Sequence, residues 1–191
     1  TLLVGVPGGQ SSSLEHYRVE GDWSTSAFPL VSAALTGRSC VIKGLAPDSI
    51  QGDRAVINHL SLFGQELRWK DDVLHFRPRP LVNPGTLDLA DTPDLFPALA
   101  ILAALTPGET RFSGATHLKF KETNRIERIV GGLLEAGIHA VEQDDGAIIG
   151  HGRPGRAMIE SGGDHRILMA FECLSLVSTG RTQVHGRGCE G

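Results

Sequence analysis

The chain is organised around the segment Lys119-Phe120-Lys121-Glu122-Thr123-Asn124-Arg125-Ile126-Glu127-Arg128, which is followed by the apolar run Ile129-Val130-Gly131-Gly132-Leu133-Leu134. The apolar residues recur at helical spacing, which predicts a charged loop running from Lys121 into an amphipathic helix that ends at Gly137. Lys121 and Arg125 are four residues apart and would share one side of the first turn. Two cations beside the free N–H groups of a helix start favour binding of a carboxylate or a phosphate.

Glu122 would lie about 100° around this helix from Lys121. A carboxylate so close to cations is expected to be ionised unless desolvation opposes them, and that opposition is how proton-transfer groups are tuned. The alternative for this segment is a solvated helix start with an ordinary ion pair.

The composition indicates an ordinary globular domain that binds neither nucleic acid nor membrane. The 191 residues are 40% hydrophobic and 21% charged, with a net charge of −4, and the basic residues are scattered instead of forming a tract. The longest apolar run, Leu95 to Leu105, is shorter than the ~20 residues of a membrane span and contains Pro97. An anion site must therefore be a local focus of positive charge.

The three cysteines, Cys40, Cys173 and Cys189, have no C-x-x-C spacing. Their odd number argues against a disulfide framework or a zinc site and favours a reducing compartment, which we expect to be the cytoplasm. The chain opens at Thr1 without an initiator methionine, so we expect it to be a piece of a longer protein.

The chain repeats one pattern of elements. We predict a leading segment at 1–16 and one α/β domain at 17–191, built from β-α-β-α-β-β units around a helical core, with units at about 17–86, 87–152 and 156–191 and the last one truncated. Strands are expected at 17–22, 39–43, 66–69, 73–77, 87–89, 110–113, 139–142, 147–150, 157–160 and 182–185. Helices are expected at 24–35, 55–63, 95–105 and 167–177, and a loop running into a helix is expected from 121 to 137.

Asp22, Asp94 and Asp164 precede the first helix of each unit, at intervals of 72 and 70 residues (94 − 22 and 164 − 94). All three could be N-caps that each contribute about 1 kcal/mol, and we adopt that interpretation for Asp22.

The second and third units carry the chemistry at their helix starts. If these starts converge at one end of the helices, six residues gather there: Asp94, Lys121, Glu122, Arg125, His165 and Arg166. Three cations, two carboxylates and a histidine around helix N-termini describe an anion pocket able to transfer protons. The sequence has no Walker A or G-x-G-x-x-G motif and no workable metal-ligand spacing, so we expect no bound nucleotide and no metal.

Four motifs resemble those of the 5-enolpyruvylshikimate-3-phosphate synthase family, the glyphosate-sensitive enzymes of aromatic biosynthesis. Lys121-Glu122-Thr123-Asn124-Arg125 resembles the family motif K-E-[ST]-D-R. The other three are Gly163-Asp164-His165-Arg166-Ile167-Leu168-Met169-Ala170, Glu20-Gly21-Asp22-Trp23-Ser24-Thr25-Ser26-Ala27-Phe28 and Leu89-Ala90-Asp91-Thr92-Pro93-Asp94. They occur in the family's order from about Tyr17 to the end of the chain.

The resemblance implies an enzyme of two domains, each of three such units, in which this chain is most of the C-terminal half. Its partner would be the other domain, and its substrates shikimate 3-phosphate and phosphoenolpyruvate. It implies catalytic roles for Asp94, Glu122 and Lys121. Substrate binding is implied for Lys121, Arg125, His165 and Arg166, and for His117 near the shikimate phosphate. It calls for no metal or organic cofactor.

Two departures from the family pattern matter. Asn124 replaces the usual Asp, which removes a charge beside Arg125 and is expected to loosen its orientation. His117 occupies a position where many members have Asn or Arg. Two alternatives stay open: the related transferase acting on UDP-N-acetylglucosamine, and a non-catalytic anion-binding domain of the same fold. We predict that this chain alone binds substrates feebly and does not turn over.

Overall fold

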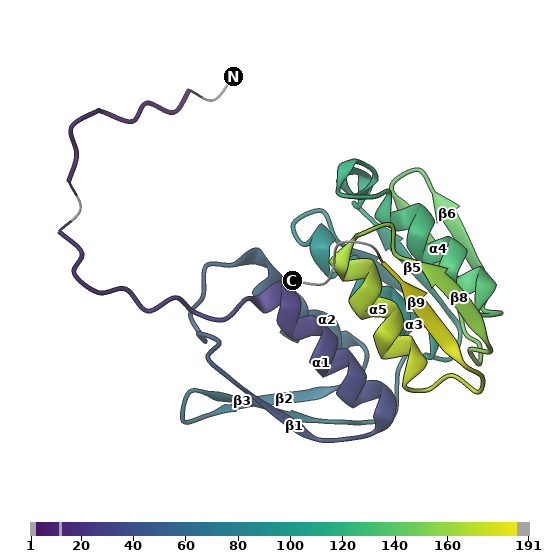
Figure 1. Ribbon diagram of the computed structural model, residues 1–191. Coiled ribbons are helices and arrows are strands. Elements are labelled where there is room, and N and C mark those ends of the chain that lie inside the picture. The colour runs from purple at the N-terminus through teal and green to yellow at the C-terminus, as the bar shows by residue number, and fades with distance from the viewer. Residues whose placement is uncertain (1–2, 12, 187–191) are drawn as a thin grey trace.

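The computed structural model describes residues 3–11 and 13–186 and arranges them as three β-sheets around packed helices (Figure 1). The first unit contains α1 (Trp23–Thr36), β1 (Cys40–Lys43), η1 (Gly52–Ala55), α2 (Val56–Leu62), β2 (Glu66–Lys70) and β3 (Val73–Arg77). The second contains β4 (Thr86–Asp88), η2 (Pro93–Leu95), α3 (Phe96–Ala104), β5 (Glu109–Ser113), η3 (Thr116–Phe120), α4 (Arg125–Glu135), β6 (Ala140–Gln143) and β7 (Gly146–Gly150). The third contains β8 (Ala157–Glu160), α5 (His165–Ser175) and β9 (Thr182–His185).

The sheets follow the predicted repeat. Their strand orders are β1-β3-β2, β4-β5-β7-β6 and β8-β9. The pairs β4–β5 and β8–β9 are parallel, and the hairpins β2–β3 and β6–β7 are antiparallel. The predicted α/β class is therefore confirmed, whereas the exact unit boundaries stay a prediction.

The helical core is formed by the first helices of the three units, α1, α3 and α5, which pack against one another. Every residue of α3 is buried, as expected for a helix enclosed on all sides. Trp23 and Phe96 are fully buried. Trp69 is partly buried and meets Trp23 edge to face at 6.0 Å between ring centroids.

Glycine ends the first helix where the sequence predicted. Gly37 adopts φ 67° after α1, and its N–H and that of Arg38 bond back to carbonyls of the last turn. This left-handed conformation is costly for residues with a Cβ and explains why glycine stands there.

The predicted strand at 17–22 is wrong. In the second and third units the parallel strand pair is extended by a bond from Leu89 N–H to Ser113 O and from Ser161 N–H to His185 O. The first unit keeps the equivalent bond, from Gly21 N–H to Gly44 O at 2.7 Å. Residues 13–20 do not pair with β1 and run away from it instead (Figure 1). The sequence begins with a short apolar run, Leu2-Leu3-Val4; Leu3 and Val4 form no strand, and Leu2 lies outside the described residues.

Candidate functional site

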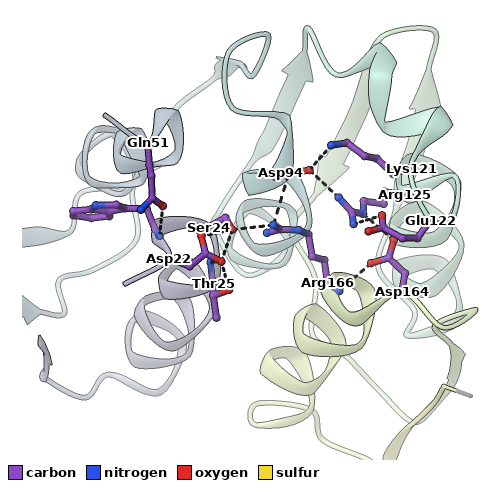
Figure 2. A network of polar contacts seen from close by, with 11 residues as sticks. Asp22, Ser24, Thr25, Gln51, Asp94, Lys121, Glu122, Arg125, Asp164 and Arg166 are labelled. Atoms are coloured by element: carbon purple, nitrogen blue, oxygen red, sulfur yellow. Dashed lines mark hydrogen bonds and ion pairs between the residues drawn. The ribbon is translucent and has the colours of Figure 1, made fainter. Parts of the chain in front are cut away.

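The predicted convergence of charged side chains centres on Asp94 (Figure 2). Its Oδ1 lies 2.8 Å from Arg125 Nη1 and 3.2 Å from Lys121 Nζ. Its Oδ2 lies 3.6 Å from Arg166 Nη2. Three cations from separate segments thus surround one carboxylate, which concentrates positive charge in a chain whose net charge is negative.

Asp94 differs from the aspartates at the equivalent positions of the other units. It lies within the short turn η2 rather than at an N-cap, because Thr92 precedes that turn. Asp22 and Asp164, in contrast, cap α1 and α5 with their side chains. The N-cap interpretation is therefore confirmed for Asp22. The carboxylate of Asp94 does not cap a helix and contacts the three cations instead.

The helix that was expected to include Lys121 begins instead at Arg125, which is a correction. Asn124 is the N-cap of α4: its backbone is extended (φ −69°, ψ 93°), and its side chain accepts the N–H of Glu127 at 3.3 Å. Asparagine favours this local bond over helical backbone. Lys121 and Glu122 consequently lie in the bend before α4, so Lys121 and Arg125 reach Asp94 from a loop and from a helix.

Arg125 is the most enclosed of the three cations around Asp94, with a side chain 1% exposed. Its Nε donates to Asp164 Oδ2 at 2.8 Å, and its Nη2 donates to Glu122 Oε2 at 2.6 Å. Together with Asp94, three carboxylates fix the guanidinium, and none of these contacts involves Asn124. The geometry supports a role for Arg125 in holding Asp94 and Glu122, and its predicted contact with substrate stays a prediction.

Asp164 connects α5 to this arginine and was recognised in the sequence only as a helix-start residue. Its Oδ1 accepts Arg166 N–H at 2.9 Å, while Oδ2 accepts from Arg125 and from Thr123 Oγ1. Burial raises the pKa of this carboxyl, but the hydrogen bond and the charge of Arg125 outweigh it and hold the pKa below its ordinary value. The sequence feature that could have indicated this role of Asp164 is its position in the same motif as Arg166.

The first unit also contributes to the site, which the sequence analysis missed. Ser24, on the first turn of α1, accepts a hydrogen bond from Arg166 Nη2 at 2.8 Å. Asp53, in η1, lies in the same electrostatic environment, because burial and the neighbouring Asp94 carboxylate raise its pKa while Arg166 opposes them. The signal for Ser24 was its place beside Asp22, the first of the three equally spaced aspartates.

The two histidines predicted at the site are not part of this network. His117 lies on η3 and His165 is the first residue of α5, and both are exposed. Among the described residues, neither forms a hydrogen bond or ion pair with the charged cluster. Their predicted contacts with substrate stay predictions.

Within residues 3–11 and 13–186, no group of three or more His, Cys, Asp or Glu side chains is placed to hold a metal ion. No helix in that part of the chain is long and apolar enough to cross a bilayer. Cys40 and Cys173 are free thiols, and Cys189 lies outside the described residues.

A family model described as EPSP synthase (3-phosphoshikimate 1-carboxyvinyltransferase) matches residues 2–190. The chain belongs to the EPSP synthase family. A relative named 3-phosphoshikimate 1-carboxyvinyltransferase from Dehalococcoides mccartyi is 40% identical over 173 residues, which cover 91% of this chain and 40% of the relative. A relative of the same name from Methanocorpusculum labreanum is 39% identical over 185 residues, covering 96% of this chain and 43% of the relative.

The solved structure of an EPSP synthase from Acinetobacter baumannii has the same fold. It superposes with a TM-score of 0.76 at 31% identity and covers 88% of this chain and 42% of that one. The resemblance carried by the four motifs is thereby confirmed, and the family match disfavours the UDP-N-acetylglucosamine alternative. The chain spans 40% of the length of the first of these EPSP synthase relatives.

Proposed function

We propose that this chain is one part of an enzyme that transfers the enolpyruvyl group of phosphoenolpyruvate to the 5-hydroxyl of shikimate 3-phosphate and releases phosphate. This is the shikimate-pathway reaction that leads to chorismate and the aromatic amino acids. The observation that carries the proposal is the contact of one carboxylate, Asp94, with three cations, Lys121, Arg125 and Arg166. Membership in the EPSP synthase family supports it.

The chemistry requires cations and proton-transfer groups side by side. Both substrates are polyanions, so cations must hold them, and carboxylates must move protons among those cations. Asp94 takes the proton of the 5-hydroxyl as its oxygen bonds to C2 of phosphoenolpyruvate. Glu122 donates a proton to C3 in the same addition. The Glu122 carboxylate then takes a proton back from C3 while the bond between C2 and the phosphate oxygen breaks, which restores the C2–C3 double bond and releases phosphate.

The three cations have different roles in substrate binding and catalysis. Lys121, with a side chain 34% exposed, is accessible to both substrates and assists proton transfer. Arg166 binds phosphoenolpyruvate; its Nη1 is buried and has no hydrogen-bond partner among the described residues. Arg125 holds the carboxylates of Asp94 and Glu122 in place. His165 and His117 are kept as candidate contacts at the edge of the site.

The rest of the active site would come from a second domain, which is the partner we propose for this chain. A chain that spans 40% of the length of a relative supports this view. We propose that the isolated chain binds its substrates weakly and does not turn over, and that the reaction takes place in the cytoplasm without a metal or organic cofactor.

The test replaces the matching segment of the Dehalococcoides mccartyi relative with this chain and measures phosphate release from the two substrates. Activity in the chimaera that is lost in its Glu122→Gln variant is the expected result. A folded chimaera without activity would overturn the proposal and favour the non-catalytic alternative. Titration of that chimaera with shikimate 3-phosphate plus glyphosate then shows whether it still binds the pair synergistically, which a scaffold has no reason to do.

A further inference from the structure

The hydroxyl of Ser24 lies between an aspartate and an arginine from opposite ends of the chain (Figure 2). Ser24 is buried, and its Oγ is 2.8 Å from Asp22 Oδ1 and 2.8 Å from Arg166 Nη2. An arginine has donors and no acceptor, so the serine oxygen must accept from Arg166. The proton of the Ser24 hydroxyl therefore points to Asp22. The hydrogen bonds form a series with a fixed direction, from guanidinium to hydroxyl to carboxylate.

The carboxylate of Asp22, at one end of this series of hydrogen bonds, is held in place by backbone contacts. Asp22 caps α1 by accepting the N–H groups of Ser24 and Thr25 at 3.0 and 3.3 Å. The N–H of Trp23 is satisfied by Gln51 Oε1 at 3.0 Å, which fixes the first turn from the other side. Burial raises the pKa of Asp22, but hydrogen bonds from Thr25 and Ser24 outweigh it and hold the pKa below its ordinary value.

Among the described residues, the Arg166 side chain has no acceptor closer than Ser24 Oγ. Asp94 Oδ2 is 3.6 Å from Arg166 Nη2, beyond hydrogen-bond distance, whereas Ser24 Oγ is at 2.8 Å. The backbone N–H of Arg166 is bound separately by Asp164 Oδ1. Because the backbone bond leaves the long side chain free to rotate, the contact with Ser24 selects its orientation beside Asp94.

We propose that Ser24 is a positioning residue, whose hydroxyl, held by Asp22, orients the Arg166 guanidinium beside Asp94 for the phosphoenolpyruvate anion. This inference rests on the proposed function. It assigns a task to the first unit of the repeat, which carries none of the residues implied by the sequence motifs as catalytic.

Thr25 offers a matched control. Its hydroxyl donates to Asp22 Oδ2, as that of Ser24 does, but it has no contact with Arg166. The variants Ser24→Ala and Thr25→Val each remove one side-chain bond to the capping aspartate, and only the first removes the acceptor of Arg166.

The first measurement uses this chain itself and does not depend on catalysis. Nitrogen NMR of the arginine side chains, with the Arg166 signals identified through Arg166→Lys, reports how fast the guanidinium rotates. We expect hindered rotation in the wild type and in Thr25→Val and fast rotation in Ser24→Ala. Equal rotation in Ser24→Ala and the wild type would overturn the inference.

The second measurement uses the active chimaera. Since a hydrogen bond to a charged group is lost, Ser24→Ala should raise the KM for phosphoenolpyruvate about tenfold, with the KM for shikimate 3-phosphate within about twofold. Thr25→Val should leave both within about twofold. An equal rise in both variants would mean that capping of α1 is responsible and would overturn the inference. A wild-type chimaera without activity would contradict the proposed function, and the NMR result would still decide whether Ser24 orients Arg166.

Discussion

Arg125 and Asp164 form the one ion pair, within the described part of the chain, whose two side chains are both buried, with exposed fractions of 1% and 0% and 2.8 Å between Nε and Oδ2. A buried charge is tolerated when its partner is present and its other polar atoms are bonded. Arg125 begins α4 of the second unit, and Asp164 caps α5 of the third. One contact therefore joins two units of the fold and fixes the arginine that holds Asp94 and Glu122.

Removing Asp164 should destabilise the chain far more than removing the cap of α1. Asp164→Ala leaves the buried guanidinium without its most enclosed partner, for which we expect a loss of about 3–5 kcal/mol in the free energy of unfolding. Asp22→Ala removes a cap without a directly paired buried arginine and should cost about 1 kcal/mol. Urea unfolding of both variants measures the difference, and equal losses would contradict a special role for the buried pair.

The same ion pair should make the free energy of unfolding depend on pH in the acidic range. The pKa of Asp164 is lowered in the folded chain, so its contribution to stability is present above the unfolded pKa, about 3.9, and is lost as the pH falls through the folded value. We expect the gap in unfolding free energy between the wild type and Asp164→Asn to be largest near pH 6 and to shrink below about pH 4. Urea unfolding across this pH range tests it, and a constant gap would refute the prediction.

The sequence predicted the parts of the structure that depend on local patterns. Glycines that end helices, together with the strand-like segments between them, indicated the order of the elements. The nearly equal spacing of the three aspartates indicated that the helix starts of the units are equivalent. The start of α4 was predicted too early because the polar residues before Ile126 carry no apolar spacing that would mark a boundary, whereas the actual start depends on one local bond of Asn124. The link from Ser24 to Arg166 spans 142 residues, so no local pattern could indicate it.

Substitution of Glu122 should lower activity without destabilising the fold. Its side chain is 52% exposed, and its ion pair is to Arg125 three residues along the chain. In the active chimaera, Glu122→Gln should lower kcat by about 10²–10⁴-fold, the usual contribution of a general acid or base, with stability within about 0.5 kcal/mol. Steady-state kinetics and urea unfolding measure both quantities. Glu127→Gln, an exposed change in the first turn of α4, is the control, and an equal effect of the two variants on kcat would argue against proton transfer by Glu122.

Two adjacent glycines of α4 should respond in opposite ways to alanine. A Cβ on Gly132 would lie 2.1 Å from Phe171 Cζ, and one on Gly131 would meet no atom within 4 Å. Gly132→Ala must push apart α4 and α5, which should cost about 1–3 kcal/mol. Gly131→Ala should instead stabilise the chain by about 0.5–1 kcal/mol, since alanine favours helix. Thermal or urea unfolding checks the signs, and a loss in both variants would contradict the observed packing.

Restoring the usual family residue at position 124 should change little. Asn124 caps α4 through a side-chain oxygen that Asp would also provide, and Arg125 is oriented by Asp94, Glu122 and Asp164 without any bond to Asn124. We therefore expect Asn124→Asp to keep kcat within about threefold and stability within about 0.5 kcal/mol. Asn124→Ala, which removes the cap, should lose about 1 kcal/mol. Kinetics of the chimaera decide the matter: a gain in kcat of about tenfold or more in Asn124→Asp would show that the additional charge orients Arg125 after all, because a surface substitution without such a role has a far smaller effect.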